Sequence, residues 1–116
     1  MADRRYWRVR LTRPAETDFQ NILHWTSERF GDAQARIYAD TLNEAIEALM
    51  EGPDVAGARR RDEIAEGLMT LHVARGGRRG RHFVLYRVSG VGEPLQIDVL
   101  RLLHDAMDLP RNLERN

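Results

Sequence analysis

Two kinds of hydrophobic periodicity divide the chain into helical and extended segments. Apolar residues in two consecutive segments each fall on one arc at about 100° per residue, which predicts two amphipathic helices. Before them, Trp7, Val9 and Leu11 alternate with polar residues, which predicts a half-buried strand. The first helical arc holds Ala15, Phe19, Ile22, Leu23, Thr26 and Phe30, and the second holds Ala35, Tyr38, Leu42, Ala45, Ile46 and Leu49.

Turn and cap residues mark where the two helices should begin and end. Pro14 suits the first turn of a helix, and Gly31 is expected to end that helix. Asp32 is expected to be the N-cap of the second helix, which Gly52 and Pro53 end. The link between the helices is so short that they should form an antiparallel hairpin.

Three further strands are predicted after a loop over residues 51–66. Met69, Leu71 and Val73 alternate with polar residues, and a turn rich in glycine and arginine over 75–81 leads into the run 82–88. That run is apolar on both faces, which is typical of a central strand. A last strand is predicted over residues 95–103.

The predicted order of elements is β-α-α-β-β-β. It describes an α+β domain in which a helical hairpin packs on one face of a small, mainly antiparallel sheet. A chain of 116 residues is long enough for one hydrophobic core. We therefore expect a single domain over 1–116, with a short polar tail from about residue 105 and a concave face on the side of the sheet away from the helices.

The composition excludes several classes of protein. The chain has no cysteine, which excludes disulfide frameworks, cysteine nucleophiles and cysteine zinc sites. It shows neither a secretory signal nor the run of roughly 18 apolar residues that a spanning helix needs. We therefore expect a soluble, cytoplasmic protein with no membrane partner.

Charge is balanced overall but not along the chain. The net charge is zero, and all 18 basic residues are arginines. Residues 14–57 carry nine acidic residues against two arginines, whereas residues 58–92 carry eight arginines against three acidic residues. Because arginine binds carboxylate and phosphate through two hydrogen bonds, the basic segment would suit either RNA or an acidic peptide, and charge alone does not choose between them.

No cofactor, metal or nucleotide motif occurs, so the histidines are the main candidates for chemistry. His24 is expected on the solvent face of the first helix, while His72 and His82 flank the arginine-rich turn without a third metal ligand. His104 follows a strand end, three residues after Arg101. A histidine there can act as a general base and an arginine can stabilise phosphate charge, so Arg101 and His104 are the catalytic candidates, with a structural role as the alternative.

The order and spacing of several segments resemble the ParE branch of the RelE/ParE toxin superfamily of bacterial toxin–antitoxin modules. The resemblance runs from Val9 to about Leu109. It is carried by Leu11 to Phe19, the Phe30-Gly31 break followed by Gln34-Ala35, Tyr38 with Leu42, Asp62-Glu63-Ile64 leading to Gly67-Leu68, His82 to Tyr86, and Val99 to His104 with Met107-Asp108.

The resemblance implies the fold already predicted and adds a function. ParE-like toxins poison DNA gyrase and stop replication, and a small ParD-like antitoxin neutralises them. The RelE branch instead cleaves ribosome-bound mRNA and usually has a Tyr or His near its C-terminus. Here no Tyr follows Tyr86 and the tail offers only His104, which favours the gyrase poison over the ribonuclease. Met69 departs from the family pattern, which commonly has Arg there.

The expected contact residues come from the basic segment, from the C-terminal segment, from Trp25 and Ile37 off the predicted core arcs, and from Tyr38 on the second arc. We expect the antitoxin to cover Trp25, Ile37 and Tyr38. The toxin needs no cofactor and no sequence-specific DNA binding of its own, and a diverged member would only bind its antitoxin. Beside Arg101 and His104, the residues expected at the target are Arg75, Arg78, Arg79, Arg81, Arg87, Met107 and Asp108.

Overall fold

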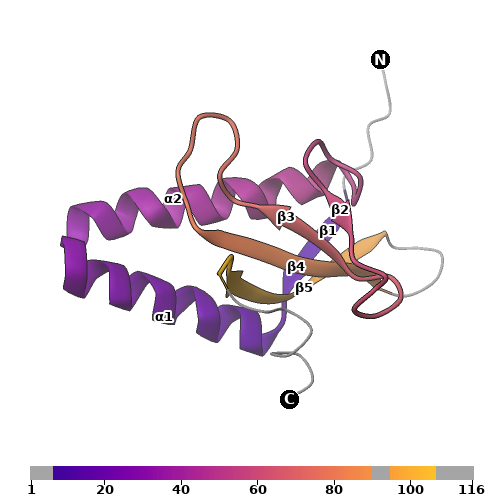
Figure 1. Ribbon diagram of the computed structural model, residues 1–116, viewed down its shortest axis with the longest axis horizontal. Coiled ribbons are helices and arrows are strands. Elements are labelled where there is room, and N and C mark those ends of the chain that lie inside the picture. The colour runs from indigo at the N-terminus through magenta and orange to yellow at the C-terminus, as the bar shows by residue number, and fades with distance from the viewer. Residues whose placement is uncertain (1–6, 90–94, 107–116) are drawn as a thin grey trace.

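The computed structural model of the protein describes residues 7–89 and 95–106, and its elements follow the predicted order with two short additions (Figure 1). No helix in these ranges is both long and apolar enough to cross a membrane. The elements are β1 (Arg8–Leu11), α1 (Arg13–Phe30), α2 (Asp32–Ala48), the 3-10 helix η1 (Leu49–Glu51), β2 (Arg59–Arg60), β3 (Met69–His72), β4 (His82–Ser89) and β5 (Gln96–His104).

The strands form one mixed sheet in the order β1-β5-β4-β3-β2. The first strand pairs in parallel with the last, and the other neighbours pair antiparallel. The sheet is therefore mainly antiparallel, as predicted, and β4 lies at its centre. The β4–β5 register places His82 opposite His104 and Phe83 opposite Leu103, so the histidine that ends β5 and the one that begins β4 meet at the same end of the sheet.

Local hydrogen bonds explain where the helices begin and end. Thr12 caps α1 by accepting the backbone N–H of Ala15 at 3.3 Å, and Pro14 lies in the first turn. Gly31 has φ of 93°, a conformation that favours glycine, and its N–H donates to Ser27. The same glycine is the N-cap of α2, and no side chain caps that helix. The expectation that Asp32 would be the N-cap was wrong, because Asp32 is already the first helical residue.

The main core lies between the helical hairpin and one face of the sheet. Hydrophobic side chains of both helices and of the strands close into one buried cluster there. A smaller cluster of Leu68, Leu85 and Leu103, with Phe83 packed against it, gives β4 buried residues on both of its faces. The main cluster contains Ala15, Leu42, Ala45, Ile46, Leu49, Met69, Leu71, Val73, Val84, Tyr86, Ile97, Val99 and Leu102.

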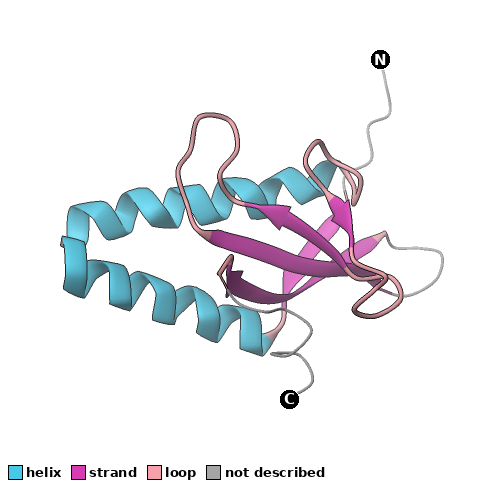
Figure 2. Cartoon of the chain, in the orientation of Figure 1, coloured by secondary structure: helices cyan, strands magenta, loops and turns pink. Residues whose placement is uncertain are grey.

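Two further expectations differ from the structure. Phe30 was predicted on the buried arc of α1, but 65% of it is exposed, because the hairpin extends past the ends of the strands and leaves its tip uncovered (Figure 2). The loop predicted over 51–66 contains β2, which pairs with β3 through Arg59 opposite Thr70 and Arg60 opposite Met69. Two arginines carry no hydrophobic alternation, so the pattern did not predict this strand.

Candidate functional site

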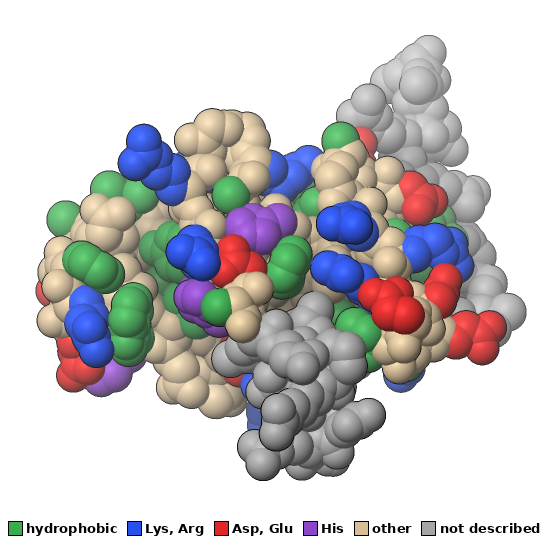
Figure 3. All heavy atoms as spheres, viewed as in Figure 1, with side chains coloured by type: hydrophobic (Ala, Val, Ile, Leu, Met, Phe, Trp, Pro, Cys, Tyr) green, Lys and Arg blue, Asp and Glu red, His purple; other side chains and the backbone are tan. Residues whose placement is uncertain are grey.

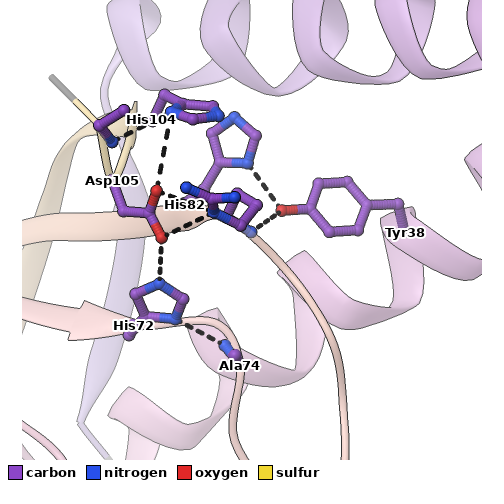
Figure 4. A network of polar contacts seen from close by, with 8 residues as sticks. Tyr38, His72, Ala74, His82, His104 and Asp105 are labelled. Atoms are coloured by element: carbon purple, nitrogen blue, oxygen red, sulfur yellow. Dashed lines mark hydrogen bonds and ion pairs between the residues drawn. The ribbon is translucent and has the colours of Figure 1, made fainter.

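Asp105 joins side chains from three segments at the end of the sheet (Figure 4). Its Oδ2 lies 2.9 Å from His72 Nε2, and its two oxygens accept Arg81 Nε at 3.1 and 3.2 Å. His104 Nδ1 lies 3.7 Å from its Oδ1. The hydrogen bond from His72, followed by that from Arg81, holds the pKa of Asp105 below its usual value. This carboxylate is therefore charged and shared between Arg81 and the imidazole of His72.

Tyr38 connects α2 to the same group of residues. Its Oη accepts the backbone N–H of Arg81 at 3.0 Å and lies 2.7 Å from His82 Nδ1. The phenolic oxygen has two lone pairs and one hydrogen, so beside Arg81 it can either donate its hydroxyl hydrogen to His82 Nδ1 or accept a hydrogen from it. Burial raises the pKa of Tyr38, so the hydroxyl hydrogen is retained.

His82 is held neutral by its surroundings. Burial is the main cause that lowers its pKa to about 4, and nearby His104 lowers it further, against the opposing effect of Asp105. The rings of His82 and His104 meet edge to face with centroids 5.3 Å apart. The tautomers of His72 and His104 are set by backbone N–H groups, because Ala74 donates to His72 Nδ1 and Ala106 donates to His104 Nδ1.

A cleft of about 790 Å3 opens beside these residues, between the helical hairpin and the β3–β4 loop. Its apolar wall includes Ile22, Trp25 and Phe30, and its lining also includes His82 and His104. Figure 3 shows imidazole, basic and acidic side chains gathered next to hydrophobic ones on one face of the molecule. A mostly apolar cleft with a few polar groups converging on it is the usual form of a binding site.

The predicted arginines do not form one patch. Arg78 pairs with Glu44 of α2, and Arg81 pairs with Asp105. Arg75 donates to the carbonyl of Ala56 at 3.1 Å. The loop between β3 and β4 contains Arg75, Arg78, Arg81 and the exposed Arg79. Arg87 is exposed near the opposite end of β4, opposite Asp98 in the register, and it is therefore separated from the loop.

Arg101 forms an ion pair with Asp18 of α1. Its Nε and one terminal nitrogen donate to the carboxylate of Asp18 at 2.7 and 3.1 Å, and the backbone N–H of Leu102 donates to the same carboxylate at 2.9 Å. The side chain of Asp18 is only 13% exposed. No hydrogen bond or ion pair in the described ranges joins Arg101 to His104, so the geometry supports the structural alternative for Arg101 and leaves His104 at the cleft.

The structure also places the residues expected to meet the antitoxin. Trp25 and Ile37 are each 51% exposed, as their positions off the core arcs predicted. Tyr38 is half-buried, and its hydroxyl group is hydrogen-bonded to Arg81 and His82. Met107 and Asp108 lie outside the described residues.

Sequence reasoning did not identify Asp105 as a member of the site. The only local signal is its position directly after His104 at a strand end, because its partners His72 and Arg81 come from distant parts of the chain. His24, by contrast, lies where the pattern predicted, exposed and paired with Glu28 one turn later. In the part of the chain that the structure describes, no group of three or more acidic or imidazole side chains could hold a metal ion.

We expect the free energy of unfolding to fall as the pH decreases from about 6.5 to 4. His82 has a pKa of about 4 in the folded chain and an ordinary value of 6.5, so the unfolded chain binds this proton first. Stability from this group is present above pH 6.5 and is lost on acidification, with a slope of at most about 1.4 kcal/mol per pH unit.

Urea unfolding at intervals between pH 7 and pH 4 measures this slope. The His82→Gln variant removes the titrating group and should flatten the curve. A wild-type curve as flat as that of the variant would contradict the assignment of a neutral, half-buried His82.

Comparison with known proteins relates this fold to toxins. The model of a family described as the ParE toxin of the type II toxin–antitoxin system, parDE, matches residues 9–109. The chain is 36% identical over 106 residues to Toxin ParE1 of Mycobacterium tuberculosis strain H37Rv, covering 91% of this chain and 97% of that one. It is 31% identical over 103 residues to Toxin ParE of Escherichia coli, covering 89% of each.

Solved structures share the fold. A structure of the chromosomal ParDE system from P. aeruginosa aligns with a TM-score of 0.69 at 20% identity, over 84% of this chain and 95% of that one. The toxin–antitoxin complex RelBE2 from Mycobacterium tuberculosis aligns with a TM-score of 0.53 at 24% identity, over 85% of this chain and 98% of that one.

Proposed function

Because this chain belongs to the ParE toxin family of type II toxin–antitoxin systems, we propose that it arrests growth by inhibiting DNA gyrase and that a cognate antitoxin neutralises it. The observation that carries the proposal is the family match, which spans residues 9–109 and therefore all of the described helices and strands except the first residue of β1. The proposed partners are a ParD-like antitoxin and gyrase in the cytoplasm.

The proposed action on gyrase is binding and not catalysis. A toxin that stabilises the cleaved-DNA intermediate of gyrase lets breaks accumulate while gyrase performs its own chemistry. The site supports this proposal because two of its charged groups are already paired: Asp105 is held by His72 and Arg81, and Arg101 is held by Asp18. At the cleft we assign the exposed Arg79 and the partly exposed His104 to target contact, with Arg87 near the far end of β4 as a separate candidate.

Neutralisation is proposed to occur by docking of an antitoxin segment on the helical hairpin. Trp25, Ile37 and Phe30 are large apolar side chains that are each more than half exposed. Apolar groups gathered on the surface of a small protein typically mark a place where another protein binds. RelBE2 of Mycobacterium tuberculosis, which shares the fold, was solved as a toxin–antitoxin complex.

Pulse labelling after induced expression in a bacterial host tests the proposed target. We expect thymidine incorporation to stop within minutes while methionine incorporation continues, because a gyrase poison blocks replication before translation. Purified protein should then inhibit supercoiling by gyrase in vitro.

Three outcomes of this experiment would contradict the proposal in different ways. If methionine incorporation stops first, the target is translation and His104 becomes the candidate base of an mRNA endonuclease. If growth continues without arrest, the chain is a member that only binds its antitoxin. If replication stops but supercoiling by purified gyrase is unaffected, the target is another replication protein.

A further inference from the structure

Two strands of the sheet end in a histidine whose ring accepts a hydrogen bond from the backbone two residues later. Ala74 donates its N–H to Nδ1 of His72 at 3.0 Å, and Ala106 donates its N–H to Nδ1 of His104 at 3.1 Å. A backbone N–H can only donate, so the lone pair of each Nδ1 must face it and the ring hydrogen must lie on Nε2. Each of these imidazoles therefore presents one N–H donor in a fixed direction.

The two donors differ in what they meet. Nε2 of His72 lies 2.9 Å from Oδ2 of Asp105, so its hydrogen is donated to that carboxylate. Nε2 of His104 has no hydrogen-bond partner among the residues that the structure describes, and the side chain is 42% exposed. Oδ1 of Asp105 lies 3.7 Å from Nδ1 of His104, which is the other ring nitrogen and is beyond hydrogen-bond distance. The donor of His104 is therefore open to a partner from outside the chain.

The ring of His104 is held in place by its neighbours (Figure 4). It packs edge to face against His82, which lies opposite it in the β4–β5 register. The turn that follows is fixed as well, because the backbone N–H of Asp105 donates to the carbonyl of Arg81 at 2.7 Å and its carboxylate accepts Arg81 Nε. A donor that is already oriented loses little freedom when it binds, so its hydrogen bond contributes more to affinity.

We infer that His104 contacts the target through Nε2–H, as a hydrogen-bond donor to an oxygen acceptor such as a carboxylate on the target protein. The hydrogen bond from His72 to Asp105 shows the same kind of contact within this chain. Nε2 has no lone pair with which to accept a proton, and the lone pair of Nδ1 is already used, so His104 is not a general base. The inference rests on the proposed function, which assigns His104 to target contact, and it adds the chemistry of that contact.

Two amide substitutions separate the two nitrogens of this ring. Counted from Cβ, the side-chain oxygen of asparagine takes the place of Nδ1, and the side-chain nitrogen of glutamine takes the place of Nε2. His104→Asn therefore keeps the acceptor for the N–H of Ala106 and removes the outward donor. His104→Gln keeps the outward donor and removes that acceptor. The two variants thus change target contact and local structure in opposite directions.

Inhibition of supercoiling by purified protein measures the contact. We expect His104→Asn to raise the concentration needed for half-inhibition at least about tenfold, as the loss of one hydrogen bond to a charged group does. His104→Gln should recover most of that loss. Urea unfolding should rank the variants in the reverse order, since only asparagine still accepts the N–H of Ala106. The same substitutions at His24, which is 75% exposed on α1, should not change inhibition.

Growth arrest after induced expression is compared in the same variants, because this readout does not require gyrase to be the target. If His104→Gln loses more activity than His104→Asn, the role of the ring is structural. If both variants lose all activity, the ring acts as a base. Either result overturns the inference. Binding of nicked DNA by the unmodified chain without gyrase, abolished by His104→Asn, would make the acceptor a phosphodiester and overturn its assignment to protein.

Long-range 1H–15N spectra of the unmodified chain test the fixed donor without any target. We expect the ring hydrogen on Nε2 of both His72 and His104 at neutral pH. A hydrogen on Nδ1 of His104 would overturn the inference and leave the proposed function standing. If the hydrogen lies on Nε2 but the unmodified chain does not arrest growth, the proposed function fails, and the contact with a target fails with it.

Discussion

Replacing Asp18 with alanine is expected to lower the free energy of unfolding by about 3 kcal/mol. The carboxylate accepts two hydrogen bonds from Arg101 and one from the backbone N–H of Leu102, at 2.7 to 3.1 Å. Without it, a largely covered guanidinium and a strand N–H lose their acceptor together. Removing one partner of such a pair costs more than the pair itself contributes, because the remaining groups stay desolvated.

Urea unfolding of three variants separates this effect from a general loss of helix charge. Glu16→Ala removes an exposed carboxylate from the first turn of the same helix and should cost less than about 1 kcal/mol. Asp18→Asn keeps one acceptor oxygen and should fall between the two alanine variants. A cost for Asp18→Ala no larger than that for Glu16→Ala would show that the contact with Arg101 does not stabilise the fold.

This result changes how Arg101 variants should be interpreted. Charge reversal at Arg101 would place a second carboxylate beside Asp18, so it should destabilise the chain even if Arg101 never touches the target. A loss of toxicity in that variant is therefore informative only when the unfolding free energy is measured beside it. His104 is the better test of target contact, since its side chain is 42% exposed and borders the cleft.

The two long helices and the strands β1, β3, β4 and β5 were predictable from the sequence because each of them has a local pattern. The helical arcs, the proline near the start of α1 and Gly31 at its end are all read within a few residues. The central position of β4 followed from its lack of alternation, since a strand covered on both faces is apolar throughout. β2 escaped prediction because its stability comes from pairing with β3 and not from its own two arginines.

The contacts that define the site were not predictable, because each joins residues distant in the sequence. Asp18 meets Arg101 across 83 residues, and Tyr38 meets His82 across 44. Sequence pattern placed Tyr38 on the core arc and His82 in a strand, but it gave no reason to pair them. The exposure of side chains was easier to predict than their contacts, because the angular positions of Trp25 and Ile37 on the helices were enough to assign them to the surface.

Alanine at Gly80 is expected to destabilise the fold by about 2 kcal/mol through crowding. A Cβ there would lie 2.5 Å from Val73 Cγ2 and 2.9 Å from Tyr38 Oη. Val73 is fully buried, so it cannot move aside without disturbing the core. Gly77, in the same loop, offers a matched comparison because a Cβ there meets nothing within 4 Å while its φ is 81°.

The two alanine variants should therefore destabilise the fold for different reasons, and they should affect the site differently. Gly77→Ala strains only the backbone, at about 1 kcal/mol, and should leave the imidazole NMR signals of His82 unchanged. Gly80→Ala should displace Tyr38 from His82 Nδ1 and shift those signals, and adding Val73→Ala should recover part of its cost. If both glycine variants leave His82 unperturbed, Tyr38 is not positioned by close contact with the loop, and the cleft does not depend on how tightly that loop packs.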